Sequence, residues 1–115
     1  MLNLTVIAVG RLNAAYYKQA AAEYEKRLSA FCKVHVIELA EEAIAEKNAS
    51  PAVIEKALEK EGKAILAAVP KGAVLTALCV EGRQLSSEAL AHRLSEWAVS
   101  GVSCAAFAIG SSHGL

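Results

Sequence analysis

One stretch decides the fold of this chain, the run Val74-Leu75-Thr76-Ala77-Leu78-Cys79-Val80. The run is almost wholly apolar, which is typical of a central parallel strand that is covered on both faces. Similar short runs predict three further strands, over residues 3–9, 34–39 and 103–109. The first of these is apolar at both odd and even positions, so it too is expected to be covered on two sides.

Segments with helical spacing of apolar residues separate the predicted strands. They predict helices over 14–31, from Pro51 to just before Pro70, and from 87 to about 99, with a loop over 40–49. Asn13, Ser50 and Ser86 are the predicted N-caps, because their side chains can accept a hydrogen bond from the first helical turn. The first helix is expected to bury one stripe of residues: Tyr17, Ala20, Ala21, Tyr24, Leu28 and Phe31.

Strict alternation of strand and helix predicts an α/β fold with a parallel, doubly wound sheet and right-handed crossovers. We expect residues 1–115 to form one domain. Gly10, Gly82 and Gly110 follow three of the strands, at the carboxyl edge where open α/β sheets bind ligands. Glycine there lets the backbone approach a ligand closely. The alternative is that these are ordinary turn glycines.

Composition narrows the class of protein. The chain is 55% hydrophobic and 21% charged, which excludes intrinsic disorder. Twelve basic and twelve acidic residues give no net charge, which by itself favours a neutral enzyme or a binding module over a nucleic-acid binder. Apolar runs are too short for a membrane span, so no membrane partner is expected. Three cysteines without a paired spacing indicate reduced thiols and a cytoplasmic location.

Catalytic motifs are sparse. The chain has no Walker motif, no GxGxxG and no GxSxG, and its histidines and cysteines fit no zinc pattern, so no metal is expected. Cys79 lacks an evident orienting group for a Cys–His nucleophile. Glu81 and His113 fall near the ligand edge, but solvated or structural roles account for both. The catalytic residues therefore stay unassigned.

Several stretches together resemble one family, the large-subunit ribosomal RNA pseudouridine N3-methyltransferases of the knotted SPOUT superfamily. The resemblance spans the whole chain, with the motifs in the same order as in the family, and each motif is moderately specific. Its stretches are Leu4-Thr5-Val6-Ile7-Ala8-Val9-Gly10, Ala22-Glu23-Tyr24-Glu25-Lys26-Arg27-Leu28, Glu59-Lys60-Glu61-Gly62, Leu78-Cys79-Val80-Glu81-Gly82-Arg83-Gln84-Leu85-Ser86-Ser87-Glu88 and Phe107-Ala108-Ile109-Gly110-Ser111-Ser112-His113-Gly114-Leu115.

The resemblance implies methyl transfer from S-adenosylmethionine to the N3 of a pseudouridine in 23S ribosomal RNA. It implies a homodimer that works on the ribosome. Cofactor contacts of the family fall on the positions of Leu78 and Gly110. Both positions lie on the edge that the strand pattern had already indicated as a ligand crevice.

Two departures from the family pattern matter. The family has Gly-Gly after the fourth strand, whereas this chain has Gly110-Ser111, and a positive φ at Ser111 would be strained. The family's chain also continues past Leu115 into a strand and helix that thread the knot. We therefore expect a C-terminally incomplete SPOUT-like domain whose 115 residues are inactive alone. Alternatives are a non-catalytic α/β binding module or inactive truncated relative, and a flavodoxin-like nucleotide binder, which would lack its phosphate loop.

Overall fold

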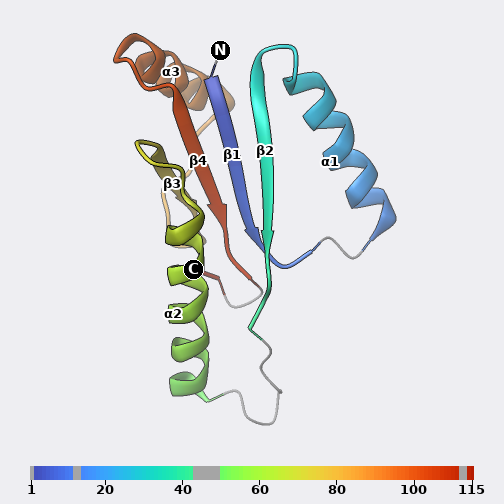
Figure 1. The fold of residues 1–115 in the computed structure, drawn as a ribbon, viewed down its shortest axis with the longest axis vertical. Coiled ribbons are helices and arrows are strands. Elements are labelled where there is room, and N and C mark those ends of the chain that lie inside the picture. Colours follow the sequence, from blue (N-terminus) through green and yellow to red (C-terminus); the bar gives the residue numbers. More distant parts are fainter. Residues whose placement is uncertain (1, 12–13, 43–49, 112–113) are drawn as a thin grey trace.

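The predicted alternation is confirmed. A computed structural model describes residues 2–11, 14–42, 50–111 and 114–115. Strands and helices follow one another in strict order: β1 (Leu2–Val9), α1 (Ala15–Leu28), β2 (Cys32–Leu39), α2 (Pro51–Ala68), β3 (Val74–Leu78), α3 (Ser87–Val99) and β4 (Cys104–Ile109) (Figure 1). The four strands form one parallel sheet, so the fold is of the predicted α/β class.

The order of the strands across the sheet is β2-β1-β4-β3, which places β1 and β4 at the centre. The prediction that residues 74–80 form a central strand is wrong, because β3 lies at the edge of the sheet that the described residues form. It is also shorter than predicted, since its ladder with β4 ends at the pair Leu78 and Ile109. Beyond this pair the chain turns, with the Gly82 N–H donating to the Cys79 carbonyl at 3.1 Å, and Val80 is left 99% exposed.

One face of the sheet carries the core. Ile7 and Val9 of β1 are buried with Ala106 and Ala108 of β4, and Ile65 of α2 packs against them. Successive side chains of a strand point to opposite faces, so the residues of β1 that alternate with this buried set lie on the other face. That second set, Leu4, Val6 and Ala8, is only half-buried. Strand β1 is therefore covered on both faces, as predicted, but much more completely on the face that packs against α2.

Helix α1 accounts for this difference. None of its residues is buried, and Tyr17 and Tyr24 are 56% and 62% exposed. Figure 1 shows α1 standing to one side of β2, away from the centre of the sheet. The predicted buried stripe is thus wrong for this helix, and Phe31 lies beyond its end. An apolar stripe is buried only where a second surface packs against it, and here the described residues leave that position open.

The helix starts agree with the predicted caps at two of three places. The Ser50 Oγ accepts a hydrogen bond from the Val53 N–H at 3.3 Å, and the Ser86 Oγ accepts one from the Ala89 N–H at 3.0 Å. At α1 the N-cap residue is Ala14, which has no side chain to accept a bond. The predicted cap, Asn13, lies outside the described residues.

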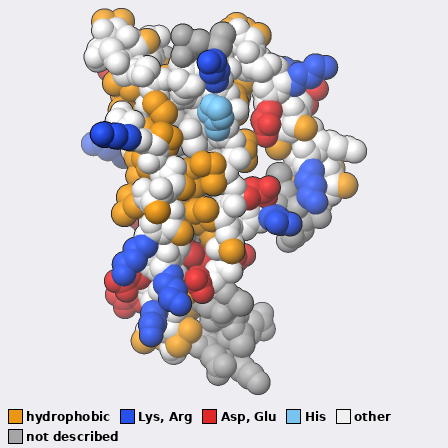
Figure 2. Space-filling model, viewed as in Figure 1, with side chains coloured by type: hydrophobic (Ala, Val, Ile, Leu, Met, Phe, Trp, Pro, Cys, Tyr) orange, Lys and Arg blue, Asp and Glu red, His pale blue; other side chains and the backbone are white. Residues whose placement is uncertain are grey.

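The surface is rich in hydrophobic side chains. Figure 2 shows them gathered across the middle of the face seen in Figure 1, with Lys and Arg side chains above and below. Large hydrophobic residues remain exposed on several elements, among them Tyr16 of α1, Leu66 of α2 and Leu78 of β3. In the described part of the chain, the helices are too short or too polar to cross a membrane.

Candidate functional site at the carboxyl edge of the sheet

The two residues predicted to contact a cofactor lie at neighbouring strand ends. Leu78 pairs with Ile109, and Gly110 follows directly, one residue beyond the ladder. Gly10 follows β1 at the same edge, with a φ of +101° that favours glycine. The predicted juxtaposition of Leu78 and Gly110 is therefore observed, whereas their role in holding a cofactor stays a prediction.

Gly110 is required by a close approach of the chain to itself. A Cβ at this position would lie 2.5 Å from the Gly114 carbonyl oxygen and 2.9 Å from the Leu115 Cγ. The turn that brings Gly114 back is closed by its own N–H, which donates to the Ser111 carbonyl at 2.9 Å. The chain itself thus occupies the space that a side chain at position 110 would need.

Ser111 fits this turn without backbone strain. None of the described residues other than glycine has a positive φ, so the strain anticipated for Ser111 is absent. Its hydroxyl donates a hydrogen bond to the Glu61 Oε1 at 2.8 Å. The serine that departs from the family pattern therefore adds a side-chain bond to α2 that a glycine lacks.

Glu61 also belongs to this edge of the sheet, although the sequence patterns indicated no role for it. Only 5% of it is exposed, and its Oε2 accepts a hydrogen bond from the Glu42 backbone N–H at 2.9 Å. The signal for its burial was its position: Ala57, Glu61 and Ile65 are spaced four residues apart and share one face of α2. A carboxylate on that apolar stripe needs hydrogen-bond donors, and both come from loops at the carboxyl edge.

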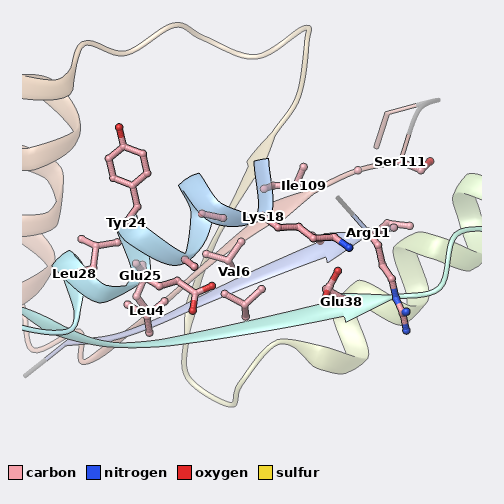
Figure 3. A pocket seen from close by; sticks show the side chains of 18 of the residues that line it. Leu4, Val6, Arg11, Lys18, Tyr24, Glu25, Leu28, Glu38, Ile109 and Ser111 are labelled. Atoms are coloured by element: carbon pink, nitrogen blue, oxygen red, sulfur yellow. The ribbon is translucent and has the colours of Figure 1, made fainter. Parts of the chain in front are cut away.

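A cleft of about 890 Å³ lies between α1 and the half-buried face of the sheet, the face that carries Leu4, Val6 and Ala8 (Figure 3). Such a volume suits a ligand of the size of a nucleoside-containing cofactor. Arg11, Glu38 and Ser111 lie toward one end of the cleft, and Leu4 and Leu28 lie toward the other. The charged end includes Gly110, whereas Leu78 is not among the lining residues. Of the two residues predicted to contact a cofactor, the cleft is therefore lined by Gly110, after β4, but not by Leu78 of β3.

Of the two candidate bases, only Glu81 is among the described residues, and it does not line this cleft. Glu81 is exposed in the turn after β3, and His113 lies outside the described residues. His35 is exposed on β2, and the exposed His92 contacts Glu96 at 2.7 Å. Among the residues that the structure describes, no three His, Cys, Asp or Glu side chains gather as metal ligands would. Its cysteines are free thiols, of which Cys32 is buried.

Comparison with known proteins identifies the protein family to which this chain belongs. A four-stranded parallel α/β sheet with a glycine turn at its carboxyl edge is consistent with several enzyme families. A family described as "Predicted SPOUT methyltransferase" matches residues 2–115. The chain therefore belongs to the SPOUT methyltransferases, a family of methyl-transferring enzymes.

One curated relative of the chain carries a name that states its activity. The chain is 45% identical over 114 residues to the ribosomal RNA large subunit methyltransferase H of Bifidobacterium animalis subsp. lactis (strain AD011). The match covers 99% of this chain and 71% of the relative. The resemblance that the sequence motifs suggested is thereby confirmed.

Proposed function

We propose that this protein is a ribosomal RNA methyltransferase, and that it transfers a methyl group from S-adenosylmethionine to the N3 of a pseudouridine in 23S RNA. The observation that carries the proposal is the match over nearly the whole chain to a relative named as a large-subunit ribosomal RNA methyltransferase. The paired ends of β3 and β4 support it, because a ligand crevice is expected at the carboxyl edge of such a sheet.

Leu78 and Gly110 are the residues that we propose to hold the methyl donor. Gly110 lies past the last ladder pair, so neither neighbouring strand pairs with it. It also lines the cleft between α1 and the sheet, whose size suits the donor. Leu78 is half exposed on the other side of β4. These positions fit recognition by backbone N–H and C=O groups, which explains why their side chains are unremarkable.

The chemistry asks little of the protein beyond positioning. S-adenosylmethionine would supply an activated methyl group, because its sulfonium sulfur leaves as a neutral thioether when the methyl carbon is transferred. The protein's contribution is to align the acceptor nitrogen with that methyl carbon, and correct alignment can supply much of the rate gain. The N3 proton must also leave, and no described residue is assigned to take it.

We further propose that residues 1–115 act as one SPOUT-like domain and that two copies associate, because the exposed tyrosines of α1 leave apolar surface to cover.

The test is methyl incorporation into 23S RNA. Protein produced from its complete gene is incubated with radiolabelled S-adenosylmethionine and with ribosomes from a strain that lacks this modification. Mass spectrometry of digested RNA should then show an N3-methylated pseudouridine. Ribosomes already modified at this position serve as the control and should take up no label.

The outcomes separate the alternatives. Methylation at a uridine, or at another atom, would refute the proposed specificity. Donor binding by calorimetry without incorporation would favour the non-catalytic binding module. Failure to bind S-adenosylmethionine at all would refute the role proposed for Leu78 and Gly110.

A further inference from the structure

We infer that Glu61 is a positioning residue, which sets the backbone at Gly110–Ser111 for the methyl donor and acts on the reaction only through that turn. This inference rests on the proposed function for its catalytic meaning, but its structural part stands on the contacts of Glu61 alone.

The Glu61 carboxylate joins three separate parts of the chain. Its Oε1 accepts from the Ser111 hydroxyl at 2.8 Å, and its Oε2 accepts from the Glu42 N–H at 2.9 Å. These partners lie 50 and 19 residues away in sequence. Burial of a carboxylate is costly unless it is hydrogen-bonded, so both bonds are needed to keep Glu61 in place. Each oxygen thus holds a different loop against α2.

The two loops belong to strands that are not neighbours. Glu42 follows β2 and Ser111 follows β4, and β1 lies between these strands in the sheet. Glu61 therefore bridges the carboxyl edge across the end of β1, beside the turn at Gly10. Figure 1 shows the C-terminal end of the described chain beside the middle of α2, as this bridge requires.

Helix α2 provides a fixed reference for the bridge. Ile65, one turn after Glu61, is 4% exposed and packs in the core with Ile7 of β1. The helix is also capped at its start by Ser50. A side chain that projects from the same face of this helix is held in a constant position relative to the sheet.

Gly110 needs such a tie because the ladder no longer holds it. The last pairs on either side of β4 are made by Ile109, so Gly110 has no partner among the described strands. Ser111 is fixed by Glu61, and the Ser111 carbonyl in turn accepts from the Gly114 N–H, which closes the chain over Gly110. The path from Glu61 to Gly110 thus runs through Ser111.

The experiment compares three variants with a control. Glu61→Leu removes both bonds without leaving a buried charge, and Ser111→Ala removes only the Oε1 bond. Glu61→Gln should rescue, because its Oε1 can accept from the Glu42 N–H while its amide donates to the Ser111 Oγ. Glu59→Leu, at an exposed position on the same helix, is the matched control.

Two measurements are made at a temperature at which every variant is folded. Hydrogen exchange of the Gly114 amide, without any ligand, should accelerate about tenfold in Glu61→Leu and in Ser111→Ala, because the turn opens locally. The KM for S-adenosylmethionine should rise about tenfold in Glu61→Leu, which corresponds to ~1.4 kcal/mol, while the KM for ribosomes stays unchanged. Glu61→Gln and Glu59→Leu should resemble the unmodified protein in both measurements.

The two readouts keep this inference apart from the proposed function. If the unmodified protein does not bind S-adenosylmethionine, the proposed function is wrong, and the exchange of Gly114 still tests the tie. If Glu61→Leu lowers the thermal midpoint but leaves the Gly114 exchange and the donor KM unchanged, Glu61 is only a structural residue and the inference is overturned. A loss of rescue in Glu61→Gln would also contradict it.

Discussion

Replacement of Gly110 by alanine offers a direct test of the geometry at the carboxyl edge. The new Cβ would lie 2.5 Å from the Gly114 carbonyl oxygen, whereas ordinary contact begins near 3.4 Å. Backbone must therefore move by about 1 Å, and forced overpacking of that kind costs roughly 1–3 kcal/mol. The chain has a less costly response, which is to open the turn and lose the hydrogen bond between Gly114 and Ser111, worth about 0.5–1.5 kcal/mol.

The less costly response should dominate. We expect Gly110→Ala to lower the free energy of unfolding by about 1 kcal/mol, as measured by urea denaturation. Its effect on S-adenosylmethionine binding should be larger, because the open turn no longer presents its backbone to the ligand, and calorimetric titration should show at least a tenfold weaker Kd, or about 1.4 kcal/mol.

Gly62 provides the control for this experiment. A Cβ there meets no atom within 4 Å, and the residue lies inside α2. Gly62→Ala should therefore raise stability by about 0.5–1 kcal/mol and leave donor binding unchanged. If Gly110→Ala has the stability and the Kd of the unmodified protein, the chain does not close over Gly110, and the close approach of Gly114 to this residue is refuted.

The remaining predictions concern the core and one helix cap. Ile7 is fully buried between β4 and α2, so Ile7→Ala should cost about 2–5 kcal/mol in urea denaturation with an unchanged m-value. A cost below about 1 kcal/mol would show that this face of the sheet is loosely packed. Ser86→Ala removes the side-chain cap of α3 and should lower stability by about 0.5–2 kcal/mol, whereas Ser87→Ala, one position later, should have little effect. Equal losses in the two serine variants would refute the assigned cap.

Most of the fold could be predicted because its signals are local. The order of strands and helices follows from apolar spacing, and the starts of α2 and α3 follow from Ser50 and Ser86. The position of a strand within the sheet is not a local property. The apolar run 74–80 suggested a central strand, but β3 pairs with β4 alone among the described strands. The prediction that α1 buries an apolar stripe was wrong for a related reason, because the sequence of a helix does not show whether another surface packs against it.

The candidate site divides in the same way. The proximity of Leu78 and Gly110 could be predicted, because the carboxyl ends of parallel strands meet at one edge. Glu61 could not be identified from its residue type, since a glutamate in a helix is normally exposed. Its two partners lie in loops after different strands, so only the folded chain brings them to one carboxylate.

The pairing of β1 with β4 has a consequence for how the protein is made. Asn3 pairs with Cys104, so the centre of the sheet joins two segments that are about 100 residues apart in sequence. Until residues 104–109 leave the ribosome, β1 has only β2 beside it, and β3 has no strand to pair with. Contacts so distant in sequence form slowly, and open strand edges invite aggregation. Assembly of this sheet therefore cannot be completed before β4 is synthesised, and a nascent chain that stalls before β4 leaves β3 unpaired and one edge of β1 open.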